Sequence, residues 1–486
     1  MREMKTVIEN NVLKKCRGDK TNIVIPEGVE VISKHAVVAP SAISLTIPKS
    51  VREIHKDAFV GVYNLESITV DPENKRYCSN GNCLIDTMYK DVVFVAKNGT
   101  IPCDNTITHI KAGAFFGENV PVNIVIPANI GYIESEAFIN CNDIESITVD
   151  SDNKYYYSEN NCLINKASRE IVLGCKNSVI PENKNVTAIG QNAFYSQTYL
   201  EKIRIPDNIR TIKEKAFYNC INLKDIKLSE NLRSIEESAF EHCYNLMSIL
   251  FPESLECIGH RAFAYCSHLG GVFIPKNVEV IRCGAFANCP WILSIDVDPE
   301  NKYFHSYCDC LIDTEHKVLV QGCNDSIIPA DGSVEMIEEF AFAGCTSLKF
   351  LEIPDSVTYI GDSAFFDCVC LSELVLPKNL KRIGSYTFYN CESLTSLTLP
   401  ENLEEILDNA FFESYVEELV IPEKVTKIEQ GAFDGCVCLE RVTIPKTLTN
   451  MPDNLFVEYY ELIIRAPEGS YAQQYAKEKN ITFEAV

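Results

Sequence analysis

The hydrophobic positions of this chain recur with a period of ~23 residues and follow one template, L-x-x-I-x-I-P-x-x-V-x-x-I-x-x-x-A-F-x-x-C, which residues 348–368 match closely. The L-x-x-I-x-I part alternates apolar and polar residues, which predicts a short strand with one buried face. Proline cannot donate to a strand ladder, so it predicts the end of that strand. V-x-x-I predicts a second, shorter extended segment, and the residues before A-F predict a single helical or 3₁₀ turn.

The Ala-Phe pair marks the units. It occurs at Ala58, Ala114, Ala137, Ala193, Ala216, Ala239, Ala262, Ala285, Ala341, Ala364, Ala410 and Ala432, with variants at Ala36, Thr387 and Leu455. Every gap between these fifteen positions is 22, 23 or 56 residues. Such a period predicts a solenoid, because each unit is too small to bury its own apolar face and must stack on its neighbours.

The three gaps of 56 residues share a second pattern. They contain "VDPENKRYCSNGNCLID" from Val70, "VDSDNKYYYSENNCLIN" from Val149 and "VDPENKYFHSYCDCLID" from Val297. Each predicts a β-hairpin of about 33 residues inserted into the array, near 71–100, 150–179 and 298–327. The acidic stretches "DPEN" and "DSDN" also suggest a calcium site. None has the full ligand set of an EF-hand loop, so a turn that ends the strand is the favoured interpretation.

The ends of the chain depart from the template. Residues 1–20 contain "ENNVLKKC", which is similar to "ENNCLINK" of the second long gap, so we expect an N-terminal cap made of half a hairpin. Residues 21–460 form one repeat domain in this interpretation. Residues 461–486 contain "GSYAQQYAKEKN", which predicts a helix, and a final "ITFEAV" that predicts a strand. We expect them to form the C-terminal cap that such arrays need.

The repeated "IP…V..I...AF..C..L" unit resembles the BspA-like subclass of the leucine-rich repeat family over roughly residues 20–460. The resemblance implies an α/β repeat solenoid that is mainly β: a right-handed, curved array of about fifteen coils with a parallel sheet lining one face. Relatives in this bacterial family are mostly surface or secreted proteins credited with adhesion. The resemblance therefore implies an adhesin that binds a host protein or glycan as an alternative function.

The composition of the chain limits which classes of partner and which cellular locations are expected. The net charge of −24 argues against nucleic acid and anionic membranes as partners, since both require a basic face. No stretch approaches the roughly 20 apolar residues of a membrane-spanning helix, so we expect no membrane insertion. The N-terminus lacks the apolar run of a signal peptide. We therefore expect a cytoplasmic chain, with a secreted or cell-surface location as the alternative if an export signal was trimmed.

Twenty-two cysteines stand out in the composition. Nine of them follow the Ala marker by four residues: Cys141, Cys220, Cys243, Cys266, Cys289, Cys345, Cys368, Cys391 and Cys436. They predict a column of small packed side chains, with zinc binding and redox roles as less favoured alternatives because zinc-type pairs are missing. Neighbouring coils would bring these thiols within disulfide range, so they favour a reducing cytoplasm.

Catalysis finds no support in the sequence. The eight histidines, at 35, 55, 109, 242, 260, 268, 305 and 316, are interpreted as surface or turn residues, none in register with another ligand or nucleophile. The chain has no G-x-S-x-G elbow, no phosphate-binding glycine loop and no H-E-x-x-H. We expect a protein that is not an enzyme, with no catalytic residues, no metal and no cofactor.

Function is expected on the sheet face. In the row of residues between the last two apolar positions of each strand, Leu250 and Phe273 are large apolar residues in adjacent coils. The candidate partner-binding residues are Met247, Leu250, Phe273, Leu293 and Phe350, flanked by the charges of Arg204, Lys227, Asp296 and Glu352. In the alternative, the third hairpin, 298–328, covers this patch. The sequence thus predicts a monomeric protein-binding scaffold whose partner protein it does not identify.

Overall fold

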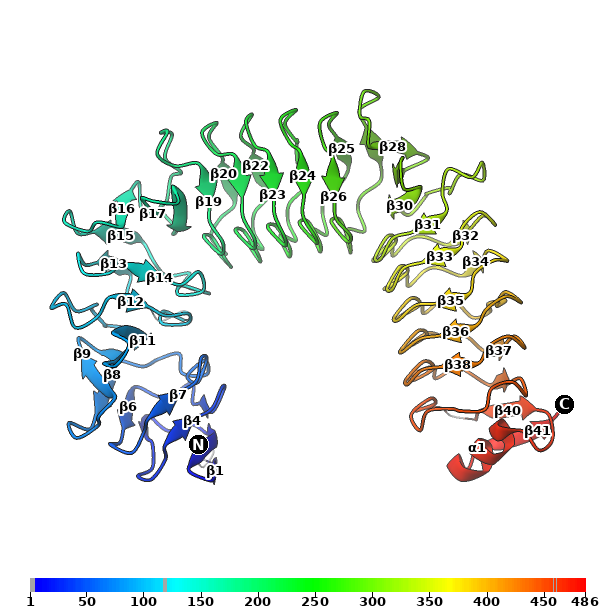
Figure 1. Cartoon of the computed structure of the whole chain (residues 1–486), viewed down its shortest axis with the longest axis horizontal. Coiled ribbons are helices and arrows are strands. Elements are labelled where there is room, and N and C mark those ends of the chain that lie inside the picture. The colour runs from blue at the N-terminus through cyan, green and yellow to red at the C-terminus, as the bar shows by residue number, and fades with distance from the viewer. Residues whose placement is uncertain (1–4, 117–119, 458, 460) are drawn as a thin grey trace. The chain divides into compact units, whose positions relative to one another are not determined.

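The computed structural model of the protein describes residues 5–116, 120–457, 459 and 461–486, so residues 1–4 of the expected N-terminal cap lie outside the described residues. The chain divides into two compact units, Met1–Leu223 (unit 1) and Lys224–Val486 (unit 2). The described residues wind through a β-solenoid of about 20 turns, and helix accounts for 2% of the chain. The predicted class, a mainly β repeat solenoid, is confirmed (Figure 1).

The L-x-x-I-x-I segments form short strands along one face. Neighbouring strands pair in parallel and in register, as Ile124 with Ile147 and Leu419 with Val442. In unit 1 these strands are β3 (Asn22–Val24), β6 (Ser44–Ile47), β8 (Ser67–Val70), β13 (Asn123–Ile126), β15 (Ser146–Val149) and β20 (Lys202–Arg204). In unit 2 they are β22 (Asp225–Lys227), β25 (Val272–Ile274), β27 (Ile295–Val297), β32 (Phe350–Glu352), β34 (Glu373–Val375), β37 (Glu418–Val420), β39 (Arg441–Thr443) and β40 (Ile463–Ala466).

The V-x-x-I segments form two-residue strands that also pair in parallel within each unit, as Ile406 with Ile428. In unit 1 they are β4 (Val31–Ile32), β7 (Glu53–Ile54), β12 (His109–Ile110), β14 (Tyr132–Ile133), β19 (Ala188–Ile189) and β21 (Thr211–Ile212). In unit 2 they are β23 (Ser234–Ile235), β24 (Cys257–Ile258), β26 (Val280–Ile281), β31 (Met336–Ile337), β33 (Tyr359–Ile360), β35 (Arg382–Ile383), β36 (Glu405–Ile406) and β38 (Lys427–Ile428).

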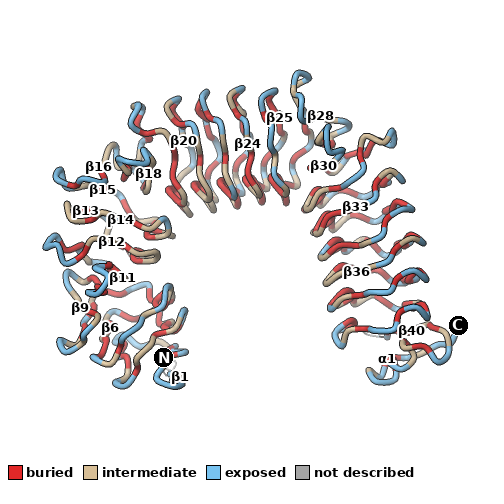
Figure 2. The backbone as a smooth tube through the Cα atoms, viewed as in Figure 1, coloured by how far each residue is buried: buried red, intermediate tan, exposed pale blue. Residues whose placement is uncertain are grey.

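The Ala, Phe and Cys positions of the template form the core between these strands. Phe rings of successive turns stack, with centroids 4.8 Å apart for Phe115 and Phe138 and 5.0 Å apart for Phe194 and Phe217. Buried positions recur in turn after turn along the backbone (Figure 2). The repeat therefore supplies a core that no single turn could bury alone.

Each long gap forms three antiparallel strands, and the third strand then pairs in parallel with the next turn. The strands are β9 (Tyr77–Asn80), β10 (Cys83–Asp86) and β11 (Asp91–Val95); β16 (Tyr156–Glu159), β17 (Cys162–Asn165) and β18 (Glu170–Leu173); and β28 (Phe304–Tyr307), β29 (Cys310–Asp313) and β30 (Val318–Gln321). Because β11, β18 and β30 pair with β12, β19 and β31, each gap supplies a turn of its own. This explains why the solenoid has more turns than the fifteen predicted.

The chain ends are built as follows. β1 (Lys5–Glu9) and β2 (Val12–Arg17) form an antiparallel hairpin, and β2 pairs in parallel with β4 and with β5 (Val37–Val38). At the other end, α1 (Tyr471–Lys479) precedes β41 (Thr482–Ala485), which pairs in parallel with β40. The Ser470 hydroxyl caps α1 by accepting a hydrogen bond from Gln473 N–H.

The acidic stretch after β8 is a turn, as its composition predicted. The Asp71 carboxylate accepts a hydrogen bond from Glu73 N–H at 2.8 Å, and the Asn74 side-chain oxygen accepts from Arg76 N–H and Tyr77 N–H. The Asn74 amide in turn donates to Pro48 O and Val51 O of the preceding turn. These oxygens close the backbone locally, which is the usual role of Asp and Asn in turns.

Candidate functional site

The sheet face of unit 2 carries most of the predicted contact residues. Gly270 N–H donates to Met247 O at 3.1 Å, and Leu293 N–H donates to Gly270 O at 3.0 Å, so these three residues form one row across three turns. Met247 and Leu293 are exposed, the latter by 66%. Gly270 between them has no side chain, and a Cβ there would come no closer than 3.7 Å to Met247 O. The row is therefore two apolar side chains separated by a notch.

The neighbouring row contains Leu250 and Phe273. Leu250 is 84% exposed and Phe273 is about half exposed, in register with Asp296 across the β25–β27 pair. Phe350 and Glu352 lie on β32, where Phe350 is also exposed. The apolar residues proposed from the sequence are thus open to solvent, and the third hairpin does not cover them. Large apolar side chains exposed in neighbouring turns are a common mark of a contact site.

Ile327 belongs to the same surface, and the sequence interpretation missed it. It is 63% exposed and precedes the buried Ile328 as Phe273 precedes Ile274. The Asn324 amide donates to Pro290 O at 2.8 Å and its oxygen accepts from Ser347 N–H, so this segment lies between the turns of β27 and β32. "SIIP" at 326–329 was the available signal, because proline follows the strand in ordinary units.

Trp291 is a second exposed residue that the pattern did not single out. Its ring centroid lies 5.5 Å from that of His268, and it is two residues before Leu293. Trp291 is the single tryptophan of the chain. Tryptophan is enriched at protein–protein interfaces, so an exposed tryptophan beside this row supports a contact surface here.

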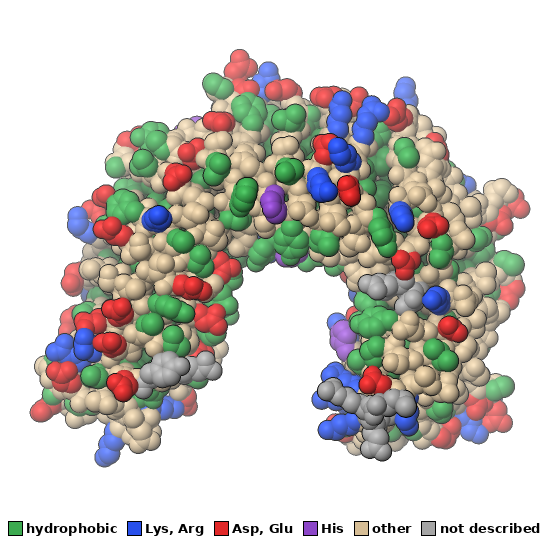
Figure 3. All heavy atoms as spheres, turned by 180° about the vertical axis from the view of Figure 1, so that it is seen from behind, with side chains coloured by type: hydrophobic (Ala, Val, Ile, Leu, Met, Phe, Trp, Pro, Cys, Tyr) green, Lys and Arg blue, Asp and Glu red, His purple; other side chains and the backbone are tan. Residues whose placement is uncertain are grey.

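The four flanking charges do not act as one group. Asp296, Glu352 and Lys227 are exposed in unit 2, and neither carboxylate has an ion pair within the part of the chain that the structure describes. Arg204 belongs to unit 1, where its guanidinium pairs with Glu182 at 2.5 Å. On the face drawn in Figure 3, acidic, basic and hydrophobic side chains are interspersed.

One histidine contradicts the expectation that none is in register with a nucleophile. His260 and Cys283 are 23 residues apart, and His260 Nδ1 lies 3.1 Å from Cys283 Sγ and 2.8 Å from Cys283 O. Burial, and then the nearby Glu339 carboxylate, raise the pKa of the Cys283 thiol to about 11. The thiol therefore stays protonated at neutral pH, unlike an activated cysteine nucleophile.

The column of cysteines uses its S–H groups as donors to the backbone. Cys220 donates to Phe194 O at 3.1 Å, Cys289 to Phe263 O at 3.1 Å and Cys436 to Phe411 O at 3.0 Å. Burial raises the pKa of each of these three thiols to about 12. Across the described ranges, no cluster of three or more His, Cys, Asp or Glu residues is arranged to hold a metal ion.

The family follows from a comparison with sequence families. The model of the BspA type leucine-rich repeat region, in six copies, matches residues 3–102, 94–184, 187–310 and 323–463. The chain belongs to this family. A comparison of this chain with curated proteins finds no match. Within the described residues, no helix has the length and apolar character needed to cross a membrane.

Solved structures were compared with this fold. A leucine rich cell surface protein from Faecalibacterium prausnitzii is 22% identical, with 97% of this chain and 94% of that chain covered and a TM-score of 0.51. The pneumococcal vaccine antigen PcpA is 15% identical (99% and 96% covered, TM-score 0.43), and a leucine-rich repeat protein from Eubacterium ventriosum is 18% identical (92% and 94% covered, TM-score 0.36). The first of these supports the solenoid fold of this BspA type chain.

Proposed function

We propose that this chain is a non-enzymatic scaffold that binds a partner protein through the sheet face of unit 2. The contact surface, called the apolar patch below, consists of Met247, Leu250, Phe273, Trp291, Leu293, Ile327 and Phe350. The observation that carries the proposal is the exposure of these large apolar side chains in neighbouring turns. Isolated exposed apolar residues are ordinary, but a contiguous group of them costs solubility and is usually covered by a partner.

Charge specifies the partner further. The chain carries a net charge of −24, and Asp296 and Glu352 lie on strands β27 and β32 of the patch without ion pairs within the described ranges. A partner with apolar side chains flanked by lysine or arginine fits this arrangement. The negative field of the chain would raise the association rate constant of such a partner. Added salt would lower that rate constant, because surface charges are screened within about 8–10 Å at physiological ionic strength.

We place this scaffold at the bacterial cell surface or outside the cell, which was the alternative from the sequence. The support is the BspA type family and the neighbour from Faecalibacterium prausnitzii, which is described as a cell surface protein. Treating intact native cells with a membrane-impermeant biotin reagent should label the chain. Labelling only after lysis would contradict the location and return the chain to the cytoplasm.

The contact surface is tested with the double variant Leu250→Asp, Phe273→Asp. A photo-crosslinking residue at position 293 first identifies the partner on native cells, and the purified partner is then titrated against wild type and variant. We expect at least a 100-fold loss of affinity, because two carboxylates replace the centre of the patch. Trp291 fluorescence reports binding directly in the wild type.

The matched control is Val420→Asp. Val420 occupies the same template position on β37 and is comparably exposed, but it lies outside the patch. It should change affinity by less than threefold. Equal losses in the control and the double variant, or an unchanged affinity in the double variant, would show that the partner binds elsewhere.

A further inference from the structure

Unit 1 contains a cavity of about 160 Å³ beside the first inserted element. It opens between the turn residues 55–57 and 111–113, because the turn between them is short. In that turn Val92 is in register with Ile110, and Val95 N–H donates to Ala114 O as Phe115 N–H donates to Ala137 O. Val95 and Phe115 thus occupy equivalent positions, but Val95 follows Val92 by three residues whereas Phe115 follows Ile110 by five. The turn after Val92 is therefore two residues shorter, which leaves the cavity.

The lining of the cavity combines apolar and charged side chains. The apolar part of the lining includes the rings of Phe59, Phe94 and Phe116. The charged part contains three cations and three carboxylates: Lys56, Arg76, Lys111, Asp57, Asp86 and Glu134. Lys56 and Asp57 are already paired, with Glu136 and Lys34. Of the carboxylates, Glu134 accepts a hydrogen bond from Ala112 N–H at 2.8 Å. Its carboxylate is therefore partly satisfied by the backbone.

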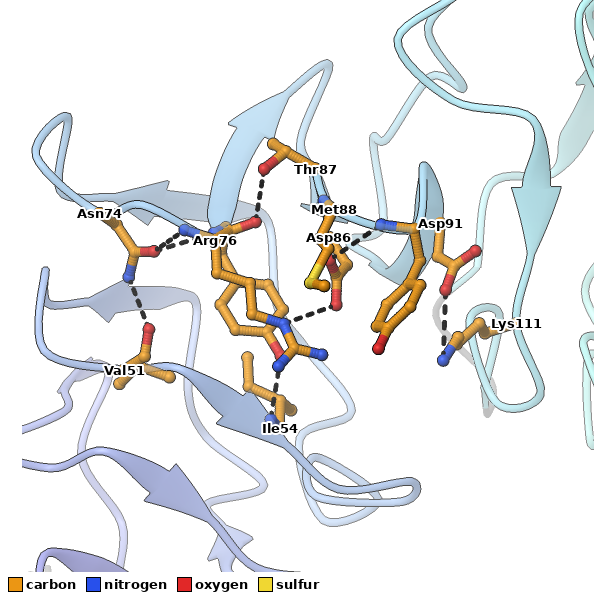
Figure 4. Close-up of polar contacts among 11 residues, drawn as sticks. Val51, Ile54, Asn74, Arg76, Asp86, Thr87, Met88, Asp91 and Lys111 are labelled. Carbon is orange, nitrogen blue, oxygen red and sulfur yellow. Dashed lines mark hydrogen bonds and ion pairs between the residues drawn. The ribbon is translucent and has the colours of Figure 1, made fainter.

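The Arg76 guanidinium lies within 6 Å of the Tyr77 and Tyr89 ring centroids and is hydrogen-bonded through one of its three nitrogens. Its Nε donates to Asp86 Oδ2 at 3.0 Å, and Asp86, only 3% exposed, uses its other oxygen to accept from Met88 N–H and Tyr89 N–H (Figure 4). Among the described residues, the two terminal guanidinium nitrogens of Arg76 have no acceptor. Lys111 pairs with Asp91 at 3.2 Å, also drawn in Figure 4, and both cations lie within 6 Å of the Tyr89 ring centroid. The terminal guanidinium nitrogens of Arg76 are therefore unused donors in the lining of the cavity.

The other two inserted elements show that the hairpin does not need this arrangement. At the position of Arg76 they carry Tyr155 and Tyr303. In the second element the corresponding space is bridged by Asn192, whose amide donates to Ser135 O at 3.3 Å. In the third element Phe340 lies close to Gly284 and under the Arg261 guanidinium. The charged cavity is therefore particular to the first element, and a structural role alone does not explain it.

We propose that this cavity binds a small carboxylate with an apolar or aromatic body. The carboxylate would accept two parallel hydrogen bonds from the terminal nitrogens of Arg76, a geometry that the guanidinium fork favours, with Lys111 adding charge. The body would pack on Phe59 and Phe94. A free carboxylic acid and the C-terminus of a peptide share this chemistry.

The test uses the full chain and calorimetric titration with 3-phenylpropionate, its neutral amide, and Ala-Ala-Phe with a free or an amidated C-terminus. The site variant is Arg76→Tyr with Asp86→Asn, which reproduces Tyr155 and Asn165 of the second element and leaves no unpaired buried charge. We expect the wild type to bind the carboxylates, and both the amides and the site variant to bind at least tenfold more weakly. Tighter binding of the tripeptide than of the free acid would identify a peptide C-terminus as the source.

Arg52→Met is the matched control, because Arg52 is an exposed arginine of unit 1 that pairs with Glu30 and does not line the cavity. It should bind as the wild type does, and thermal unfolding of all variants checks that they are folded. Equal affinity for acid and amide, no loss in the folded site variant, or no binding of either carboxylate at millimolar concentration would overturn the proposal.

Discussion

The cysteines show how residue type and position together set reactivity. The column thiols are buried, donate to backbone carbonyls of the preceding turn, and have pKa values raised by desolvation. Only the thiolate attacks disulfides or alkylating reagents, so these groups are protected while the protein is folded. The sequence argument that so many cysteines favour a reducing compartment is therefore weakened, because it counted thiols without their burial.

The difference in burial among the cysteines predicts how fast each thiol is alkylated in the folded protein. Cys103 and Cys308 are exposed, whereas the column cysteines are buried. At pH 7.5, iodoacetamide should alkylate Cys103 and Cys308 at least 100-fold faster than Cys220 or Cys289, as peptide mass spectrometry over time will show. Rapid labelling of the column in folded protein would mean that the turns open readily.

At the scale of the element, the strand template was readable because apolar and polar residues alternate and proline marks the end of each strand. The sequence predicted the parallel stacking and the turn at Asp71. It also singled out Leu250 and Phe273, with cover by the third hairpin as the open alternative to their exposure. It did not reveal that the long gaps contain turns of their own, so Ile327 was overlooked. It also missed the cavity beside β11, because a shortened turn matters only relative to its neighbours in space.

Gly174 tests how tightly an inserted element joins the array. An added Cβ there would lie 2.0 Å from the Phe194 ring, which is itself stacked on Phe217. Gly174→Ala should lower the free energy of unfolding by about 1–3 kcal/mol, the usual cost of overpacking a core. Chemical denaturation measures this, and Gly270→Ala, which meets nothing closer than 3.7 Å, should change it by less than about 0.5 kcal/mol.

At the scale of the whole molecule, the buried thiols and tyrosines make stability depend on alkaline pH. Burial raises the pKa of Cys220, Cys289 and Cys436, and of Tyr77, to about 12 in each case. The folded state therefore holds these protons more tightly than the unfolded state. The stabilisation is complete below the unfolded pKa, near 8.5 for cysteine and 10 for tyrosine, and is lost as pH rises toward the folded values.

Urea unfolding between pH 8 and pH 11 should show this loss. Each protected thiol contributes up to about 1.4 kcal/mol per pH unit to the slope, since one proton is released on unfolding. Cys220→Ala should flatten the slope by about that amount above pH 9. An unchanged slope in this variant would mean that Cys220 ionises equally in both states.

The stacked turns also bear on how the gene changes. Each ordinary turn of ~23 residues contacts chiefly its immediate neighbours, and successive turns carry nearly the same core side chains. Unequal recombination between such segments would add or remove whole turns. The core side chains at each contact between turns would stay the same. The number of ordinary turns could therefore change while the core stays the same. The inserted elements are less interchangeable, because they make contacts of their own, such as Gly174 against Phe194.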